Sequence, residues 1–276
     1  PLLEVAEPYL ALAQVIELFH PAEARPASVS QRAEIAADAV LGTDVSVGPF
    51  AVIEAASVIG DRVRIGAGTV VGRGSRVGDD SRLMPRVVLY PGTVVGRRCI
   101  IHSGVVLGGD GFGFATSAGR HHKVPHIGHV AVGDDVEIGA NTTVDRGALT
   151  ATEIGSGSKL DNLVMIAHGV VVGDGCLIAA QSGIAGSARV GARVTLAGQV
   201  GVVGHVKIAD GTVVASKSAV MQDVERGQLI AGIPAVDHRE WKRAQALSRK
   251  LPELRAEMRE LSRRIDQLEH RSPEED

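Results

Sequence analysis

Residues 53–77 read IEAASVIGDRVRIGAGTVVGRGSRV, and every sixth residue of this stretch is a branched aliphatic. The same six-residue rhythm covers residues 35–107 and, after two interruptions, residues 154–220. A strict period of this length fits neither an α-helix nor an alternating sheet, and fixed-period repetition indicates a stacked parallel β-solenoid. We therefore expect an all-β solenoid with three short strands and eighteen residues per coil, between nine and ten coils in all.

Small residues accompany the repeat. Glycine often follows the repeat aliphatic, as at Gly60 and Gly66, and we expect these glycines to adopt positive φ and turn the corners. Cys99 and Cys176 lie two places before a repeat aliphatic, where serine and threonine also occur. We predict that both are buried, reduced thiols, as is usual in a cytoplasmic protein.

Composition excludes several classes of function. The net charge is −3 and only 3% of residues are aromatic, so we expect no binding of nucleic acid. No stretch approaches the roughly 18 apolar residues of a membrane span, and no signal peptide is visible. We predict a cytoplasmic protein without a transmembrane segment. The chain begins at Pro1 rather than at methionine, which suggests a trimmed start.

The repeat divides the chain into three parts. Residues 1–30 lie outside it and contain a short amphipathic helix before Pro21, whereas residues 31–232 form the solenoid. Within the solenoid, residues 109–129 break the rhythm and are expected to form an external loop. Residues 233–276 are helical, and their apolar residues follow a heptad spacing from Leu247 onward. We expect this seam to pack against its own copies in a homo-oligomer.

The eighteen-residue coil places residues far apart in sequence in one column. Gly186 and Gly204 follow His168 at this spacing, and His205 comes next. We expect a cleft beside His168 that is floored by glycine backbone, with the Gly186 N–H free to face a developing oxyanion. In such a cleft His168 could act as a general base. The alternative interpretation is a solvated histidine on a turn.

Four histidines cluster in and next to the external loop, which raises the question of a metal site. Ligands from a single loop are an unusual way to hold a metal in a solenoid, so we predict a polar loop and no bound metal. The four residues are His121, His122, His126 and His129.

Several motifs resemble those of UDP-3-O-(3-hydroxyacyl)glucosamine N-acyltransferases, which act early in the synthesis of lipid A in Gram-negative bacteria. The resemblance covers nearly the whole chain. Its most specific parts are the insert and two short blocks, and the Ile/Val-Gly rhythm alone would fit any hexapeptide acetyltransferase. The motifs are GDGFGFA (109–115), DRGAL (145–149), KLDN (159–162), IAHGVVVGDG (166–175) and GQVGVVGHVKIADG (198–211).

The resemblance implies a homotrimer of left-handed parallel β-helices with active sites between neighbouring subunits. Acyl carrier protein would deliver a 3-hydroxyacyl thioester on its phosphopantetheine arm, with no permanently bound cofactor. The acceptor would be the 2-amino group of a UDP-3-O-acylglucosamine. The acidic carrier protein would dock on the basic face of the C-terminal helices, which carries Arg239, Lys242, Arg243, Arg249 and Lys250.

The resemblance also implies roles for single residues. His168 would be the general base and His205 a second essential histidine near the reaction centre. Asp161 would support the histidine or the amine, and Gly186 would supply the oxyanion N–H. Substrate contacts would come from Phe112, Phe114, Asn162 and Gly204.

Two departures from the family pattern stand out. Residues 1–30 match only the end of the family's N-terminal uridine-binding domain, so binding of the nucleotide by this chain is an open question. Gly169 replaces the asparagine that usually follows the catalytic histidine. Two alternative functions also stay open. One is a sugar N- or O-acetyltransferase that uses acetyl-CoA, and the other is a catalytically silent trimeric scaffold.

Overall fold

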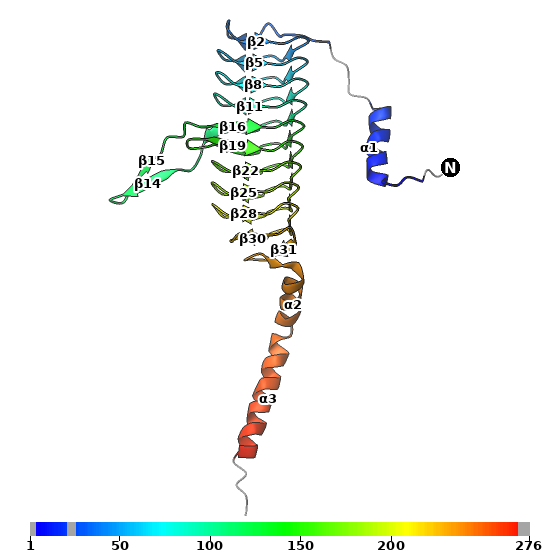
Figure 1. Cartoon of the computed structure of the whole chain (residues 1–276), viewed down its shortest axis with the longest axis vertical. Helices are drawn as coiled ribbons and strands as arrows, with labels where there is room; N and C mark the ends of the chain where they lie inside the picture. Colours follow the sequence, from blue (N-terminus) through cyan, green and yellow to red (C-terminus); the bar gives the residue numbers. More distant parts are fainter. Residues whose placement is uncertain (1–3, 21–25, 270–276) are drawn as a thin grey trace, which may run out of the picture.

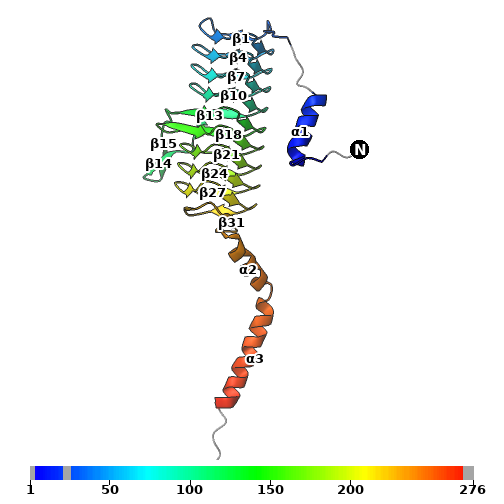
Figure 2. The same ribbon diagram turned by 45° about the vertical axis from the view of Figure 1, so that its right-hand side comes forward.

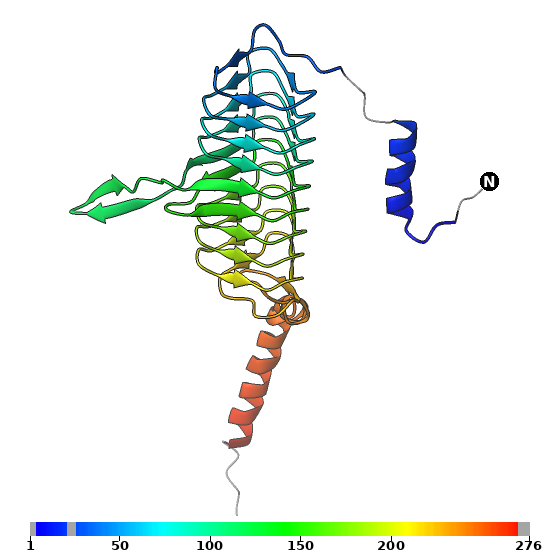
Figure 3. The same ribbon diagram turned by 45° about the horizontal axis from the view of Figure 1, so that its top comes forward.

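The computed structural model describes residues 4–20 and 26–269. The chain winds into a three-sided parallel β-helix, from one edge of which a hairpin projects, and helices α2 and α3 continue from its C-terminal end (Figure 1). The turned views show the short strands of successive coils stacked one above another (Figures 2 and 3). The predicted fold class, a left-handed β-helix with a C-terminal helical extension, is confirmed.

Each face of the β-helix is one sheet, and successive strands along the chain go to successive sheets. Sheet 1 contains β1 (Glu34–Ile35), β4 (Val52–Ile53), β7 (Val70–Val71), β10 (Val88–Leu89), β13 (Val106–Asp110), β18 (Thr143–Arg146), β21 (Met165–Ile166), β24 (Gly183–Ile184), β27 (Gly201–Val202) and β30 (Ala219–Val220). Sheet 2 contains β2 (Val40–Leu41), β5 (Val58–Ile59), β8 (Arg76–Val77), β11 (Val94–Val95), β16 (His129–Val132), β19 (Ala151–Ile154), β22 (Val171–Val172), β25 (Arg189–Val190) and β28 (Lys207–Ile208).

Sheet 3 ends in an antiparallel strand, β32, that leads into the helices. It contains β3 (Ser46–Val47), β6 (Arg64–Ile65), β9 (Arg82–Leu83), β12 (Ile100–Ile101), β17 (Glu137–Ile138), β20 (Lys159–Leu160), β23 (Leu177–Ile178), β26 (Thr195–Leu196), β29 (Val213–Val214), β31 (Leu229–Ala231) and β32 (Val236–Asp237). Over the described residues the sheets hold ten, nine and ten parallel strands, so the chain completes between nine and ten coils, as predicted.

The second residue of a typical strand points inward, and these residues form one continuous apolar core. Ile53, Ile59 and Leu89 are each at most 1% exposed, as the period predicts. Neighbouring coils are in a register of eighteen residues, for example Val88 opposite Val106. The register lengthens only at the two interruptions. Across the first, Val106 lies opposite Thr143, and across the second, Thr143 lies opposite Met165.

The glycines that follow the repeat aliphatics act differently from the prediction. Gly48 and Gly60 do not have positive φ, which instead occurs two residues later, at Phe50 and Arg62. A Cβ built on Gly48 would lie 2.7 Å from the backbone nitrogen of Ala67 in the next coil. Glycine is therefore needed at these positions because the coils approach too closely for a side chain, whereas the strained corner itself is occupied mostly by other residues.

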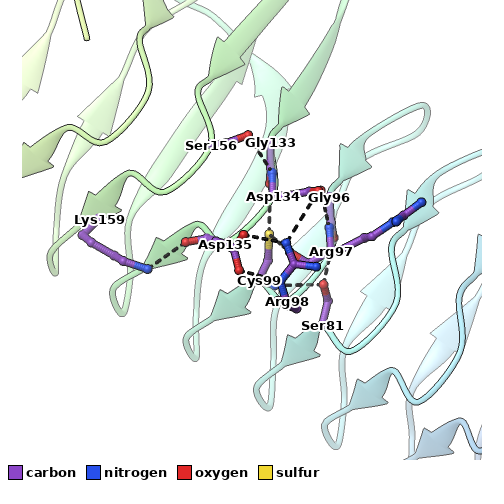
Figure 4. Close-up of polar contacts among 10 residues, drawn as sticks. All are labelled: Ser81, Gly96, Arg97, Arg98, Cys99, Gly133, Asp134, Asp135, Ser156 and Lys159. Atoms are coloured by element: carbon purple, nitrogen blue, oxygen red, sulfur yellow. Dashed lines mark hydrogen bonds and ion pairs between the residues drawn. The ribbon is translucent and has the colours of Figure 1, made fainter. Parts of the chain in front are cut away.

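A ladder of side-chain acceptors connects successive coils where sheet 2 passes into sheet 3. The Asp134 carboxylate accepts a hydrogen bond from the backbone N–H of Arg97 at 2.8 Å, and the Asp134 N–H donates to Ser156 Oγ at 3.1 Å (Figure 4). Beside this ladder, the Arg98 guanidinium binds Asp135 through two hydrogen bonds of 2.6 Å. The hydrogen bonds of the ladder satisfy corner N–H groups that the parallel sheets leave unpaired.

The two cysteines are fully buried and free, as predicted. Cys99 Sγ donates to the carbonyl of Gly133 at 3.1 Å, and Cys176 Sγ donates to that of Gly191 at the same distance. Burial raises the pKa of both thiols. Their position inside the stack therefore favours the protonated, unreactive form.

Outside the β-helix, the described residues form the helices α1 (Pro8–Phe19), α2 (His238–Ser248) and α3 (Leu251–Glu269). Leu251, Leu254, Met258, Leu261 and Ile265 of the predicted seam are all exposed on α3. Among the described residues, no helix combines the length and the apolar character needed to cross a membrane. The structure thus leaves the seam without a partner within the described chain.

Candidate active site

His168 lies on the turn between β21 and β22, at the edge where sheet 1 passes into sheet 2. Its imidazole lies directly over Gly186 of the next coil, because a Cβ built on Gly186 would come within 2.7 Å of His168 Nε2. Gly204 continues the column one coil further, where a Cβ would meet the Gly186 carbonyl at 3.0 Å. The structure therefore brings together the column of His168, Gly186 and Gly204 that the spacing predicts.

The backbone of Gly186 has one occupied and one open polar group. Its carbonyl accepts a hydrogen bond from the His205 N–H at 3.1 Å. Its own N–H donates to no acceptor within residues 4–20 and 26–269. An open backbone donor beside an imidazole is the arrangement that can stabilise a developing oxyanion.

The environment of His168 favours its neutral form. Partial burial lowers the pKa of the imidazole below its ordinary 6.5, and nearby His126 and His205 lower it further. Neither ring nitrogen of His168 forms a hydrogen bond within the described chain. A neutral imidazole with a free nitrogen can accept a proton at neutral pH.

His205 occupies one of the left-handed corners, with φ of +66°, and its side chain is exposed. It lies one residue beyond the column and two coils after His168. The corner conformation is held by the hydrogen bond to Gly186 described above. His205 is therefore close enough to influence the charge of His168 while remaining open to a ligand.

Asp161 and Asn162 lie on the opposite edge of sheet 1, where the chain enters it from sheet 3. The Asp161 carboxylate accepts from the backbone N–H of Asn162 at 2.7 Å and from that of Ala180 at 3.2 Å. Within one chain the structure thus does not bring Asp161 to His168. Asp161 instead lines a groove of about 640 Å³ on sheet 3, together with His102, Glu137, Lys159 and Asn162.

The first interruption is more ordered than the external loop that we predicted. It forms a hairpin of β14 (Phe114–Ser117) and β15 (Arg120–Lys123), which projects from the β-helix (Figure 3). The hairpin leaves the stack between a strand of sheet 1 and a strand of sheet 2, at the edge that also carries His168. Phe112 is 86% exposed, and its ring meets that of Phe114 edge-on, with the ring centroids 5.1 Å apart. The Lys123 ammonium lies 5.6 Å from the Phe114 ring and pairs with Asp110 at 3.1 Å.

The histidines of this region do not assemble into a metal site. His121 Nδ1 hydrogen-bonds Thr116 Oγ1 at 2.9 Å, and His122 is exposed on the same hairpin. Only His126 turns inward, to 5% exposure. Across the part of the chain that the structure describes, no three His, Cys, Asp or Glu residues are grouped so that they could hold a metal ion.

Two residues that the sequence did not assign to the site lie near it: His126 contacts His168, and Asp145 lies in the preceding coil. The rings of His126 and His168 meet edge-on, with centroids 5.2 Å apart. Asp145 follows Val144, which lies opposite Ile166, so Asp145 is one coil away from the residue before His168. Partial burial raises the pKa of Asp145 to about 6. The DRGAL motif contained the signal for Asp145, but nothing in the repeat placed His126.

Comparison with protein families agrees with the repeat. The bacterial transferase hexapeptide model, which describes six repeats, matches residues 33–73, 74–109 and 151–186. The model for the hexapeptide repeat of succinyl-transferase matches residues 57–90 and 129–166.

Curated relatives match over nearly the entire chain. The UDP-3-O-acylglucosamine N-acyltransferase of Pseudomonas syringae is 48% identical over 265 residues, which are 96% of this chain and 76% of the relative. The enzyme of the same name from Pseudomonas fluorescens is 51% identical and covers 95% of this chain and 75% of its own length. The enzyme of the same name from Bordetella pertussis is 47% identical, and the match covers 93% of this chain and 72% of the relative.

Solved structures share the fold. The UDP-N-acetylglucosamine acyltransferase of Arabidopsis superposes with a TM-score of 0.69 at 24% identity and covers 75% of this chain and 72% of its own. The UDP-N-acetylglucosamine O-acyltransferase of Moraxella catarrhalis gives a TM-score of 0.60 at 24% identity, and the match covers 78% of this chain and 77% of the other.

Proposed function

The chain belongs to the family of UDP-3-O-acylglucosamine N-acyltransferases, and from this we propose that it transfers a 3-hydroxyacyl chain to the 2-amino group of a UDP-3-O-acylglucosamine in lipid A synthesis. The acyl donor is a thioester on the phosphopantetheine arm of acyl carrier protein. The geometry of His168 over the Gly186 backbone carries the proposal.

The proposed reaction needs one proton acceptor and one oxyanion donor. The amine nitrogen attacks the thioester carbonyl carbon, and neutral His168 takes the proton that the amine loses. The carbonyl oxygen becomes an oxyanion, to which the Gly186 N–H donates. When the intermediate collapses, the carbon–sulfur bond breaks and His168 returns its proton to the thiolate. The products are the amide and the free thiol of the carrier arm.

Other residues of the site serve binding in this proposal. His205 is open to a ligand and contacts the sugar phosphate near the reaction centre. Phe112 and Phe114 offer apolar surface beside the same edge, and Gly204 leaves room for a thin acyl chain. Asn162 contributes to the groove on sheet 3.

We propose a homotrimer as the working form. Asp161 and His168 lie on opposite edges of sheet 1, so an active site that uses both needs Asp161 from a neighbouring copy. The exposed heptad seam of α3 supports the same assembly, because it has no partner within the described chain. Exposed basic residues on α2, such as Arg239 and Lys242, suit docking of an acidic carrier protein. The buried thiols fit the reducing cytoplasm as its location.

Acyl transfer by the purified chain tests the proposed function. Radiolabelled UDP-3-O-acylglucosamine is incubated with 3-hydroxyacyl carrier protein or with acetyl-CoA, and the amide product is counted. We expect turnover with the 3-hydroxyacyl carrier protein but not with acetyl-CoA. In His168→Ala, we expect the rate of acyl transfer to fall by at least about a hundredfold.

The control is His122→Ala, because the His122 side chain is exposed on the hairpin and forms no hydrogen bond within the described residues, while its backbone pairs with Ala115 of β14. Turnover with acetyl-CoA but not with carrier protein would favour an acetyltransferase. Full activity of His168→Ala would show that His168 is not the general base.

A further inference from the structure

His126 is the least accessible histidine near the site. It follows β15 at the base of the hairpin, and only 5% of it is exposed. Its Nδ1 lies 2.9 Å from the Val124 carbonyl, so in the neutral ring Nδ1–H is the donor and Nε2 is left as an acceptor. Among the described residues, Nε2 of His126 is the one buried side-chain nitrogen or oxygen atom without a hydrogen-bond partner.

Two glycines of the GDGFG motif hold the His126 ring in place. A Cβ on Gly111 would lie 2.9 Å from His126 Nε2, and a Cβ on Gly113 would lie 2.6 Å from His126 Cε1. The Val124 N–H donates to the Gly113 carbonyl at 2.9 Å and closes the base of the hairpin. The loop backbone therefore packs directly on the ring, and its glycines are required for that contact.

The same loop also packs against His168. A Cβ on Gly111 would lie 2.8 Å from His168 Cβ and 2.9 Å from its Cδ2. The His126 ring meets the His168 ring edge-on, with an angle of 75° between the planes. Because no hydrogen bond holds the His168 ring within the described chain, packing alone fixes its plane.

We propose that His126 is a positioning residue for His168: the edge of its buried ring holds the His168 imidazole in the orientation that places Nε2 over Gly186. This inference rests on the proposed role of His168 as the base. In many enzymes a carboxylate orients the catalytic histidine, whereas here the base of the hairpin does so through a second ring. His126 itself does not touch the substrate.

The test compares three variants of residues 1–276 by steady-state kinetics with 3-hydroxyacyl carrier protein. His126→Ala removes the ring edge, so kcat falls by about tenfold or more while KM for both substrates stays unchanged. His126→Phe restores a ring of similar size and returns kcat to within about threefold of the wild-type value. His122→Ala on the same hairpin is the matched control and leaves both constants unchanged.

A double-mutant cycle separates this inference from the proposed function. In the His168→Ala background, His126→Ala is expected to cause no further loss, because its effect passes through His168. If His168→Ala keeps full activity, the role of His168 as base fails. If His168→Ala is inactive while His126→Ala matches the wild type, only the positioning role fails. A raised KM in His126→Ala, or an equal loss of kcat in His126→Phe, also overturns it.

Gly113→Ala provides a second route if His126→Ala does not fold. Its Cβ would displace the ring at Cε1 without removing the histidine. We expect the same fall in kcat with unchanged KM. Wild-type kcat in a folded Gly113→Ala protein would contradict the proposal.

Discussion

Close packing at single residues decides how the candidate site works. The column of His168 and Gly186 depends on the absence of one Cβ, because the imidazole occupies the volume that an alanine side chain would fill. The neighbouring Asp145 shows the converse effect, since partial burial without a hydrogen-bond partner in the described chain disfavours its charge.

Gly186→Ala tests the packing of the His168 column. The added Cβ would lie 2.7 Å from His168 Nε2 and Cε1, so the ring must move. A displacement of this kind lowers kcat by about a hundredfold. We expect the thermal midpoint to change little, because the turn has no positive φ at this residue. Gly201→Ala is the control, since nothing lies within 4 Å of its Cβ. Equal kinetics in the two variants would contradict the packing argument.

Asp145→Asn tests the cost of the half-buried carboxylate. The folded pKa of Asp145 is about 6, above the usual 3.8, so the folded state resists the charged form. The penalty is small at pH 4, grows as the pH rises through the folded pKa and is fully present above about pH 7, and the asparagine amide removes it. We therefore expect the free energy of unfolding of the variant, relative to that of the wild type, to be about 1 kcal/mol larger at pH 8 than at pH 4. This figure allows for solvent screening of the half-buried carboxylate.

Urea unfolding of both proteins at the two pH values, at one protein concentration, measures this difference. Asp38→Asn, an exposed turn aspartate without a hydrogen bond in the described chain, serves as the control. A gain for Asp145→Asn that is the same at both pH values would show that burial does not penalise the carboxylate.

At the scale of elements, the coils are joined by more than their strands. Each strand of a typical coil is only two residues long, so backbone pairing alone gives little restraint at the corners. The acceptor ladder between sheets 2 and 3 fills this gap, with Asp61, Asp134 and Asp210 each accepting a corner N–H of the preceding coil. The hairpin is the one β element of the described chain that leaves the stack, and the segments at its base, through Gly111 and His126, pack on His168.

Asp134→Ala tests the contribution of one rung of the ladder. The variant leaves the Arg97 N–H without its 2.8 Å acceptor, so the free energy of unfolding falls by about 1 kcal/mol. Chemical denaturation measures the change. Asp38→Ala removes an aspartate from a similar turn that has no such bond, and we expect it to be neutral. Equal losses in both variants would assign the effect to the turn rather than to the ladder.

At the scale of the whole molecule, the chain has exposed surfaces that a single copy does not cover. The seam of α3 is exposed along its length, and Asp161 lies on the opposite edge of sheet 1 from His168. Both observations are explained if copies of the chain associate side by side, with the seams in a helical bundle and neighbouring edges completing each site.

Charge in the seam tests this assembly. We expect the wild-type protein to sediment at about three times its chain mass of 28.7 kDa. Leu254→Asp combined with Leu261→Asp buries charge in the bundle, so the protein shifts to smaller species at micromolar concentration. Ala256→Asp places the same charge on the far side of the heptad and leaves the mass unchanged. A trimer that persists in the double variant would show that the seam is not needed for association.

The six-residue period by itself determined the fold, the core and the column of His168, Gly186 and Gly204. It could do so because a solenoid repeats one local geometry, so that counting eighteen residues is the same as moving one coil. The same counting could not assign the correct role to the repeat glycines, because the distance between coils, and not the turn conformation, requires them.

Only the tertiary structure decided what happens where the repeat stops. It folded residues 109–129 into a hairpin whose base places His126 against His168, and it changed the register so that Asp145 lies beside the site. It also separated Asp161 from His168 by the width of a sheet. The physical reason is that an inserted segment has no equivalent in the neighbouring coils, so the repeat does not fix its geometry. Its position depends on non-local contacts, which residue spacing does not encode.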